Sequence, residues 1–230
     1  MRLVVLSGAG LSAESGLGTF RDEDGLWARY DLAEVATPDG FARDPALVHD
    51  FYNARRANMR GAAPNAAHDA LARLSRRDGV TMVTQNVDDL LERAGARDVI
   101  HMHGQLARAL CHGCGHRWSA RPVMQSTDPC PACATAATRP DVVWFGEIPY
   151  HMDRIEAALA EADLFVAIGT SGTVYPAAGF AQAAAAAGAR TIELNLEASG
   201  GRFDEVRAGP ASRIVPEWVD EVLREALPEA

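Results

Sequence analysis

The chain has 230 residues, a formal net charge of −9 at pH 7 and a hydrophobic content of 48%. This composition is typical of a globular chain, and the acidic balance excludes broad electrostatic binding to nucleic acid or to anionic membranes. No apolar run approaches the roughly 20 residues that a membrane span needs. The first predicted strand begins at residue 2 or 3, which leaves no N-terminal signal. We therefore expect a soluble cytoplasmic protein that binds neither a membrane nor a specific nucleic acid.

The first strand and the turn after it suggest a dinucleotide site. The apolar run over residues 3–6 is typical of a strand buried on both faces of a parallel sheet. Residues 8–13 (GAGLSA) match the pattern G-x-G-x-x-G/A, in which the backbone approaches a diphosphate and the next helix presents free N–H groups to it. The Asp or Glu usually found about 20 residues further on is missing, because residues 22–30 (DEDGLWARY) do not form a strand that ends in an acid. The turn is either an ordinary glycine-rich turn or a nucleotide site of an unusual kind.

Strands and helices alternate along the rest of the chain. Short apolar or β-branched runs predict strands over residues 80–84, 99–100, 141–146, 164–168 and 191–195. Apolar residues at helical spacing predict helices over residues 45–60, 65–77, 90–94, 152–161, 176–187 and 215–227. This alternation is typical of an α/β fold with a parallel, doubly wound, Rossmann-like sheet.

Polar or glycine-rich residues lie at the carboxyl ends of five of the predicted strands. They are residues 8–12, 85–88, 101–104 and 169–173, together with Asn195. In doubly wound sheets, ligands bind beyond the carboxyl ends of the strands. The five clusters therefore favour a ligand site over an ordinary turn.

The four cysteines predict a structural zinc site. They form two C-x-x-C pairs with 15 residues between them, and this spacing matches a tetrahedral site with four thiolate ligands. Four protein ligands leave no open position for hydrolytic chemistry. A redox dithiol or a buried apolar pair are the alternatives, and His112 and His116 are interpreted as bystanders. The ligands are Cys111, Cys114, Cys130 and Cys133.

In chain order, the motifs form one pattern. They are GAGLS at 8–12, Ser15-Gly16, Thr19-Phe20-Arg21, TQNVD at 84–88, His103-Gly104, the two cysteine pairs, Phe145-Gly146-Glu147, Gly169-Thr170-Ser171 and Asn195-Leu196-Glu197. This pattern covers nearly the whole chain and resembles the sirtuins, the NAD-dependent protein-lysine deacylases. The resemblance accounts for the missing acid, because sirtuins bind NAD in an inverted way with ribose contacts from other loops.

The resemblance also implies a domain organisation. It places a Rossmann-like NAD-binding domain at residues 1–105 and 142–230, with a helical module within about 22–78 and a zinc-ribbon insert at 106–141. A free-standing zinc ribbon often binds nucleic acid, but this insert holds few basic residues and lies within an acidic chain.

By the resemblance, most of the motifs would bind NAD. The opening turn and residues 169–171 would hold the diphosphate, residues 195–197 and Ala211 the adenosine end, and residues 85–88 the nicotinamide and its ribose. The implied NAD-binding residues are Gly8, Ala9, Gly10, Ser12, Phe20, Arg21, Trp27, Gln85, Asn86, Val87, Asp88, Gly169, Thr170, Ser171, Asn195, Leu196, Glu197 and Ala211.

The implied reaction transfers an acyl group from protein lysine to NAD, giving nicotinamide, free lysine and 2′-O-acyl-ADP-ribose. His103 would act as general base, and Asn86 is the second implied catalytic residue. An imidazole with its ordinary pKa near 6.5 suits a base. His101 competes for this role, because two residues apart on a strand share one face; the family places the base directly before glycine. A protein ADP-ribosyltransferase and a non-catalytic NAD or zinc interaction module are the alternative functions.

A finer resemblance concerns the acyl group. Tyr52-Asn53-Ala54-Arg55 resembles the Tyr-x-x-Arg of the sirtuin class that accepts succinyl and malonyl groups, and Ala36 falls where that class keeps a small residue. An Arg guanidinium can bind a carboxylate with two hydrogen bonds. From spacing alone, Tyr52 could equally be core and Arg55 solvated, with Arg56 available beside it. The implied substrate-binding residues are Ala36, Tyr52, Arg55, Phe145, Gly146, Glu147 and Val174.

Overall fold

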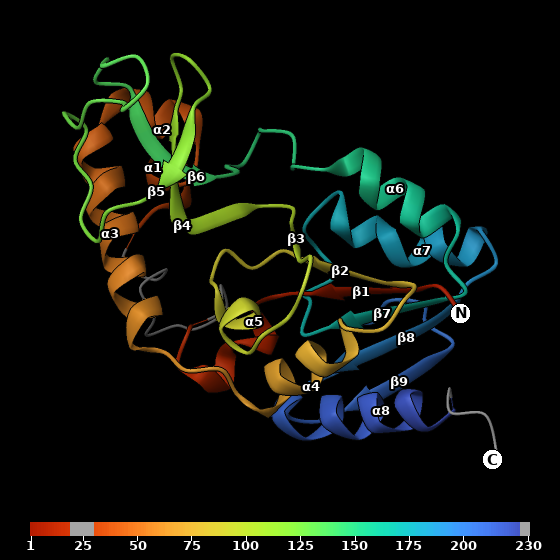
Figure 1. Cartoon of the computed structure of the whole chain (residues 1–230). Helices are drawn as coiled ribbons and strands as arrows, with labels where there is room; N and C mark the ends of the chain where they lie inside the picture. The colour runs from red at the N-terminus through yellow and green to blue at the C-terminus, as the bar shows by residue number, and fades with distance from the viewer. Residues whose placement is uncertain (19–29, 226–230) are drawn as a thin grey trace.

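A computed structural model describes residues 1–18 and 30–225 of the chain. Its centre is a parallel six-stranded sheet with the order β3-β2-β1-β7-β8-β9, as expected for a Rossmann-like fold (Figure 1). The strands are β1 (Leu3–Ser7), β2 (Val80–Thr84), β3 (Ile100–His101), β7 (Leu164–Ile168), β8 (Arg190–Asn195) and β9 (Glu205–Ala208). The prediction of a parallel α/β sheet is confirmed. The edge strand β9 was not predicted, because it is short and half-exposed.

Helices cover both faces of this sheet, so β1 is apolar along its length. Leu3 and Val5 pack into the core formed with α4 (Ala66–Leu74) and α8 (Ala211–Glu225). Val4 and Leu6 pack into the opposite core, formed with α6 (Met152–Ala160) and α7 (Phe180–Ala186). The two layers of helices lie on opposite sides of the sheet in Figure 1. None of the helices in the described residues is long and apolar enough to cross a membrane.

Three helices form a module beside the carboxyl ends of the strands (Figure 1). They are α1 (Leu32–Val35), α2 (Pro38–Arg43) and α3 (Pro45–Gly61). Side chains of Asp31, Thr37 and Asp44 cap their N-termini by accepting backbone N–H groups, as such residues commonly do. The predicted helix over 45–60 is confirmed as α3.

A second, antiparallel sheet has the order β5-β4-β6. Its strands are β4 (Gly104–Cys111), β5 (Arg117–Ser119) and β6 (Thr138–Val142). The prediction of a strand over 141–146 is therefore wrong: strand structure ends at Val142, and that strand belongs to the small sheet. The apolar residue Trp144 packs instead against α2 and α3, with its ring 5.1 Å from Phe41 and 6.4 Å from Tyr52.

The loops after β1 and β7 are in direct backbone contact. The N–H of Gly8 donates to Ile168 O and that of Gly10 to Gly169 O, both at 2.9 Å. Gly169 has a φ of +60°, and a Cβ there would lie 2.5 Å from Leu11 N. The expected helix does not follow the turn directly; two short 3-10 turns, Ala9–Leu11 and Ala13–Ser15, do. The glycines are thus required by contact between two loops.

We predict that Gly169→Ala destabilises the protein far more than Gly188→Ala. Both residues have positive φ, which costs an L-residue about 1–2 kcal/mol. Nothing lies within 4 Å of a Cβ at Gly188, whereas one at Gly169 clashes with backbone, which adds about 1–3 kcal/mol. Urea unfolding of both variants measures the difference in the free energy of unfolding. Equal losses would contradict the close contact.

Candidate functional site

The carboxyl ends of the central strands meet on one side of the sheet, facing α3 and the small sheet (Figure 1). Hydrogen bonds join their loops: Asn86 Nδ2 donates to Gly8 O at 3.0 Å, and Asn195 Nδ2 donates to Thr170 O at 2.8 Å. The strand order reverses between β1 and β7, and ligands of doubly wound sheets bind at such a reversal. The polar segments identified in the sequence are therefore brought together at the carboxyl ends of the strands.

Ser12 lies at the centre of a buried hydrogen-bond network. Its hydroxyl donates to Asp88 Oδ2 at 3.0 Å and accepts from Asn86 Nδ2 at 3.2 Å. The ring of His68 is 3.3 Å from the same oxygen through Nε2. Asn65 N–H donates to His68 Nδ1, so the ring proton is on Nε2 and points to Ser12. Burial lowers the pKa of His68 to about 4 and keeps the ring neutral.

Sequence reasoning missed His68. Its local signal is the capping box at the start of α4, in which Asn65 caps the helix and His68 returns a hydrogen bond to the Asn65 backbone. That pattern predicts the start of a helix. Only the folded chain shows that the other ring nitrogen reaches Ser12.

Asp88 is held from two sides. Its Oδ2 accepts from Ser12 and its Oδ1 accepts from Leu90 N–H at 3.1 Å. Burial raises its pKa, and these hydrogen bonds oppose the shift. A partly desolvated carboxylate of this kind can accept a further hydrogen bond from a ligand N–H group.

His103 and His101 differ in what their ring nitrogens contact. Nδ1 of His103 lies 3.1 Å from Gln85 O, and because a carbonyl oxygen only accepts, Nδ1 carries the proton and Nε2 keeps a lone pair. Burial lowers the pKa of His103, and the bond to Gln85 partly opposes this.

The ring of His101 lies between two acceptors. Its Nδ1 is 3.1 Å from Asn86 O and its Nε2 is 2.6 Å from Glu92 Oε1. Both ring nitrogens of His101 are therefore occupied by these two contacts. Sequence reasoning missed Glu92, whose contact occupies the second ring nitrogen of His101 but not that of His103.

A third apolar cluster joins the helical module to the small sheet, and it contains Ala36 and Tyr52. The Arg55 guanidinium lies 5.5 Å from the centre of the Tyr52 ring and 5.7 Å from that of Phe51. Burial raises the pKa of Tyr52, while the positive charge of Arg55 opposes the shift. Tyr52 is indeed buried, but its hydroxyl accepts from Trp144 Nε1 at 2.9 Å.

Arg56 points elsewhere. It is buried and donates from Nη2 to Asn53 Oδ1, while Asn53 Nδ2 donates to Met124 O in the connection between β5 and β6. Burial lowers the pKa of Arg56 to about 10. The structure therefore separates two neighbouring arginines. Arg55 lies beside Tyr52, whereas Arg56 bonds to Asn53, which holds the connection between β5 and β6.

The segment after β6 lies against α1. Phe145 N–H donates to Ala36 O at 3.0 Å, and the Phe145 ring is about half exposed. The Glu147 side chain is occupied internally by two bonds from Arg139, at 2.6 and 2.9 Å. Gly146 is exposed, and Val174 is partly buried in the loop after β7.

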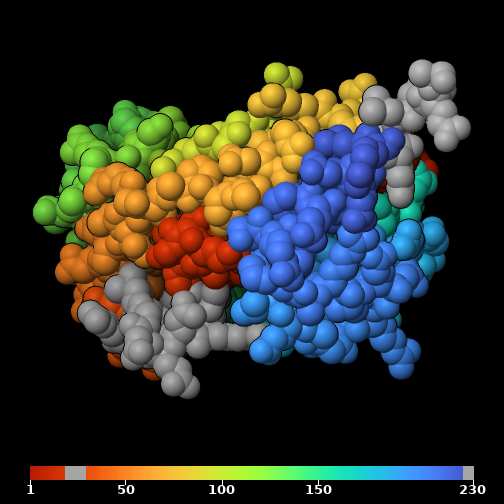
Figure 2. Space-filling model, turned by 90° about the horizontal axis from the view of Figure 1, so that it is seen from below, coloured from red at the N-terminus to blue at the C-terminus, as the bar shows by residue number. Residues whose placement is uncertain are grey.

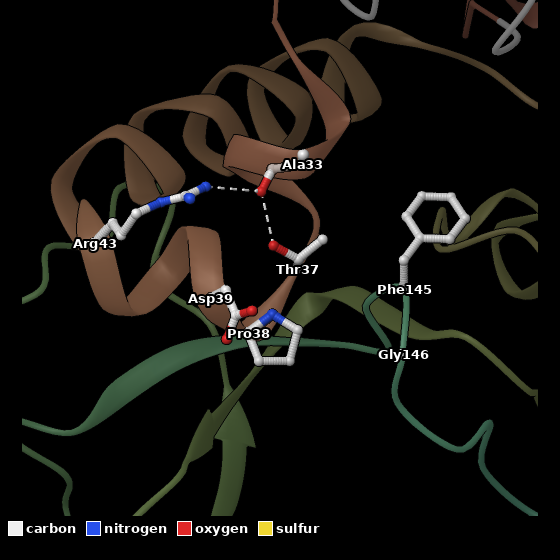
Figure 3. A pocket seen from close by; sticks show the side chains of 7 residues that line it. All are labelled: Ala33, Thr37, Pro38, Asp39, Arg43, Phe145 and Gly146. Atoms are coloured by element: carbon white, nitrogen blue, oxygen red, sulfur yellow. Dashed lines mark hydrogen bonds between the residues drawn. The ribbon is translucent and has the colours of Figure 1, made fainter.

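A surface pocket of about 400 Å³ lies next to this segment (Figure 3). In Figure 3, Phe145 and Arg43 lie at opposite sides of the pocket, with Thr37 and Asp39 between them. Thr37 Oγ1 and Arg43 Nη2 both donate to Ala33 O. The pocket is lined by α1, α2 and the 145–146 segment, and it does not include Tyr52 or Arg55.

The start of α8 is tied to the opening turn. Glu14 Oε1 accepts from Ser212 N at 3.0 Å and Oε2 accepts from its hydroxyl, which lowers the pKa of Glu14. Figure 2 shows the N-terminal segment at the surface beside the blue C-terminal helix. Ala211 begins that helix, and Leu196 and Glu197 are exposed after β8.

Of the other predicted site residues, Phe20, Arg21 and Trp27 lie outside the described residues.

The four cysteines converge as the spacing predicts. Their Sγ atoms all lie within 4.8 Å of one another, with 3.7 Å between Cys111 and Cys133 and 3.8 Å between Cys114 and Cys130. A tetrahedral zinc ion with Zn–S bonds of about 2.3 Å separates its ligands by about 3.8 Å. The cysteines are therefore positioned to bind one zinc ion.

Comparison with known proteins identifies similar chains. The Sir2 family model matches residues 8–176. An NAD-dependent protein deacylase of Caulobacter vibrioides is 61% identical, covering 97% of each chain. A Sir2 homologue solved in complex with NAD has a TM-score of 0.89 and 39% identity, covering 97% of this chain and 90% of that one. A Sir2 protein bound to a myristoylated histone peptide has a TM-score of 0.75 and 31% identity, covering 97% and 92%.

For the cysteine site, we predict one zinc ion per chain by elemental analysis. Cys130→Ser removes a buried ligand, so the ion should be lost and the melting temperature should fall, because structural zinc contributes directly to folding. His116→Ala is the matched control: its ring stacks on Trp118 and lies outside the four-sulfur group. Loss of zinc from His116→Ala, or retention in Cys130→Ser, would contradict the assignment.

Proposed function

The chain belongs to the Sir2 family, and we propose that it is an NAD-dependent protein deacylase that removes succinyl, malonyl and acetyl groups from lysine. The observation that carries the activity is the near full-length similarity to a named deacylase. The products would be nicotinamide, free lysine and 2′-O-acyl-ADP-ribose. We further propose that residues 106–141 are a structural zinc insert within the NAD-binding domain formed by 1–105 and 142–230.

NAD would bind along the carboxyl edge of the sheet. The contacting loops of Gly8–Gly10 and Gly169 carry no side chain at three positions, which suits close approach of a diphosphate. Ala9, Thr170 and Ser171 would complete this cradle. Asn195, Leu196, Glu197 and Ala211 would hold the adenosine end, and the Asn195 bond to Thr170 keeps the two loops together.

The 85–88 segment would bind the nicotinamide end. Asp88 is available to accept from an amide N–H group, since its network leaves it a partly buried carboxylate. Asn86 spans Gly8 and Ser12 and so sets the distance between the diphosphate loop and this segment. Gln85 would contact the ribose, with Val87 and Ser12 completing the wall. NAD supplies an electrophilic ribose carbon as nicotinamide leaves.

His103 would be the general base. Its Nδ1–H is held by Gln85 O, which leaves Nε2 to accept a proton from a ribose hydroxyl. His101, held between Asn86 O and Glu92, would orient the nicotinamide segment without accepting a proton. Its role follows from contacts that spacing does not define.

The acyl group would enter beside Ala36, Tyr52 and Arg55. A succinyl or malonyl carboxylate would bind to Arg55 and the Tyr52 hydroxyl, and the small Ala36 side chain would leave room for the longer chain. The substrate backbone would lie between residues 145–147 and Val174, pairing as an added strand. In this role Glu147 would contribute backbone only, since Arg139 holds its carboxylate.

For the base, we predict that His103→Asn lowers kcat/KM by about 10²–10⁴-fold on every acyl peptide. The pKa of His103 is lowered below 6.5 by burial, so the base form predominates at neutral pH. Activity should fall only as the pH drops through that lowered pKa. In a pH–rate profile, His101→Asn should still show this fall in activity at low pH, the acid limb of the profile. If the limb instead disappears in His101→Asn and persists in His103→Asn, the assignment is wrong.

For the acyl preference, we predict that Arg55→Met lowers desuccinylation roughly 10–100-fold, as expected for loss of a hydrogen-bonded ion pair, with a much smaller loss of deacetylation. Arg60→Met is the matched control, because it removes an exposed charge from the same helix. Free lysine and nicotinamide are measured with paired peptides. The chain has no lysine, so all acyl-lysine comes from the peptide. Equal losses on both peptides would exclude the carboxylate contact, and NAD label retained on protein would indicate ADP-ribosyl transfer instead.

A further inference from the structure

We propose that Trp144 is a positioning residue for acyl specificity: its indole N–H directs the hydroxyl proton of Tyr52 toward the carboxylate of an acidic acyl group. This inference rests on the proposed function, and it assigns a role to a residue outside the Tyr-x-x-Arg segment.

The direction of the hydrogen bond is fixed by chemistry. Trp144 Nε1 and Tyr52 Oη are 2.9 Å apart, and both side chains are buried. An indole nitrogen is a donor only, so the Tyr52 oxygen must be the acceptor in this bond. The Tyr52 hydroxyl therefore keeps its own proton for a different partner.

Arg55 cannot be that partner. Its guanidinium lies beside the Tyr52 ring and also carries donors only. Among the residues that the structure describes, 1–18 and 30–225, none accepts a hydrogen bond from the Tyr52 hydroxyl. The remaining proton of the Tyr52 hydroxyl thus needs an acceptor, and the terminal carboxylate of an acidic acyl group would supply one beside the Arg55 guanidinium. An acetyl group has no such acceptor at its end.

The indole is held firmly in this orientation. The Arg139 guanidinium stacks over it, 3.4 Å from the ring centre, and is itself buried. Arg139 makes two bonds to Glu147, whose Oε2 also accepts from the Trp144 backbone N–H at 2.8 Å. Arg139 belongs to β6 and donates to Val142 O. The small sheet therefore orients Trp144, and Trp144 orients Tyr52.

The test is the ratio of kcat/KM on a succinyl-lysine peptide to that on the matching acetyl-lysine peptide. Trp144→Phe keeps an aromatic face for Arg139 and removes the donor. Loss of one neutral hydrogen bond corresponds to about fivefold, so the ratio should fall by about 2–10-fold, mainly through a higher KM for the succinyl peptide. Both rates come from one preparation, so the ratio does not depend on the fraction of folded enzyme.

Two further variants separate positioning from packing. Trp218→Phe removes another buried indole, in α8 on the sheet core, and should leave the ratio unchanged. Tyr52→Phe removes the hydroxyl and should lower the ratio by itself; in that background Trp144→Phe should have no further effect. The proposal would be overturned if the ratio did not change in Trp144→Phe or in Tyr52→Phe. It would also be overturned if the double variant lowered the ratio by the product of the two single effects.

The outcome for Arg55→Met distinguishes this inference from the function on which it rests. If Arg55→Met does not change the ratio, the acidic-acyl preference itself is wrong. If Arg55→Met lowers the ratio while Trp144→Phe does not, the acyl preference stands and the positioning role of Trp144 is excluded.

Discussion

The backbone contact between the loops after β1 and β7 is the constraint on which the site depends. These are the two central strands, and the order of the sheet reverses between them. Gly10 and Gly169 touch through a direct hydrogen bond, with no room for a Cβ on either side. Asn86 and Asn195 then fasten the neighbouring strand ends to these loops. These contacts hold the carboxyl ends of the strands together at the place where we propose that NAD binds.

His101 at the end of β3 and His103 just after it illustrate how tertiary contacts distinguish similar residues. One residue, Met102, separates them, and both contact carbonyl groups of the segment after β2. The carboxylate of Glu92, in the short helix α5 (Leu90–Arg93) that precedes β3, contacts only the ring of His101. That single extra acceptor occupies the second nitrogen of His101, whereas the second nitrogen of His103 keeps its lone pair. The proposed base, His103, thus differs from His101 by one contact with Glu92, which is nine residues from His101 in the sequence.

The small sheet contributes more than a metal site. Its strand β6 carries Arg139, which holds Trp144 against α3 and the Tyr52 hydroxyl. The zinc-bearing part of the chain is therefore connected to the proposed acyl site by buried side chains. Residues 143–146 do not extend the central sheet: the Trp144 side chain packs in the cluster of the helical module, and Phe145 N–H donates to Ala36 O.

The sequence by itself determined the parallel α/β sheet, most of its strands and helices, and the zinc site, because these follow from local patterns. Buried strands need continuous apolar runs, helix starts need capping side chains, and a tetrahedral ion needs two cysteine pairs at short spacing. The family motifs likewise identified the segments that meet at the edge of the sheet. Only the tertiary structure decided the partner of β6, the presence of β9, the separate directions of Arg55 and Arg56, and the contacts of His68, Glu92 and Trp144. Each of these depends on which atoms distant segments bring within hydrogen-bond distance, and no local pattern encodes that distance.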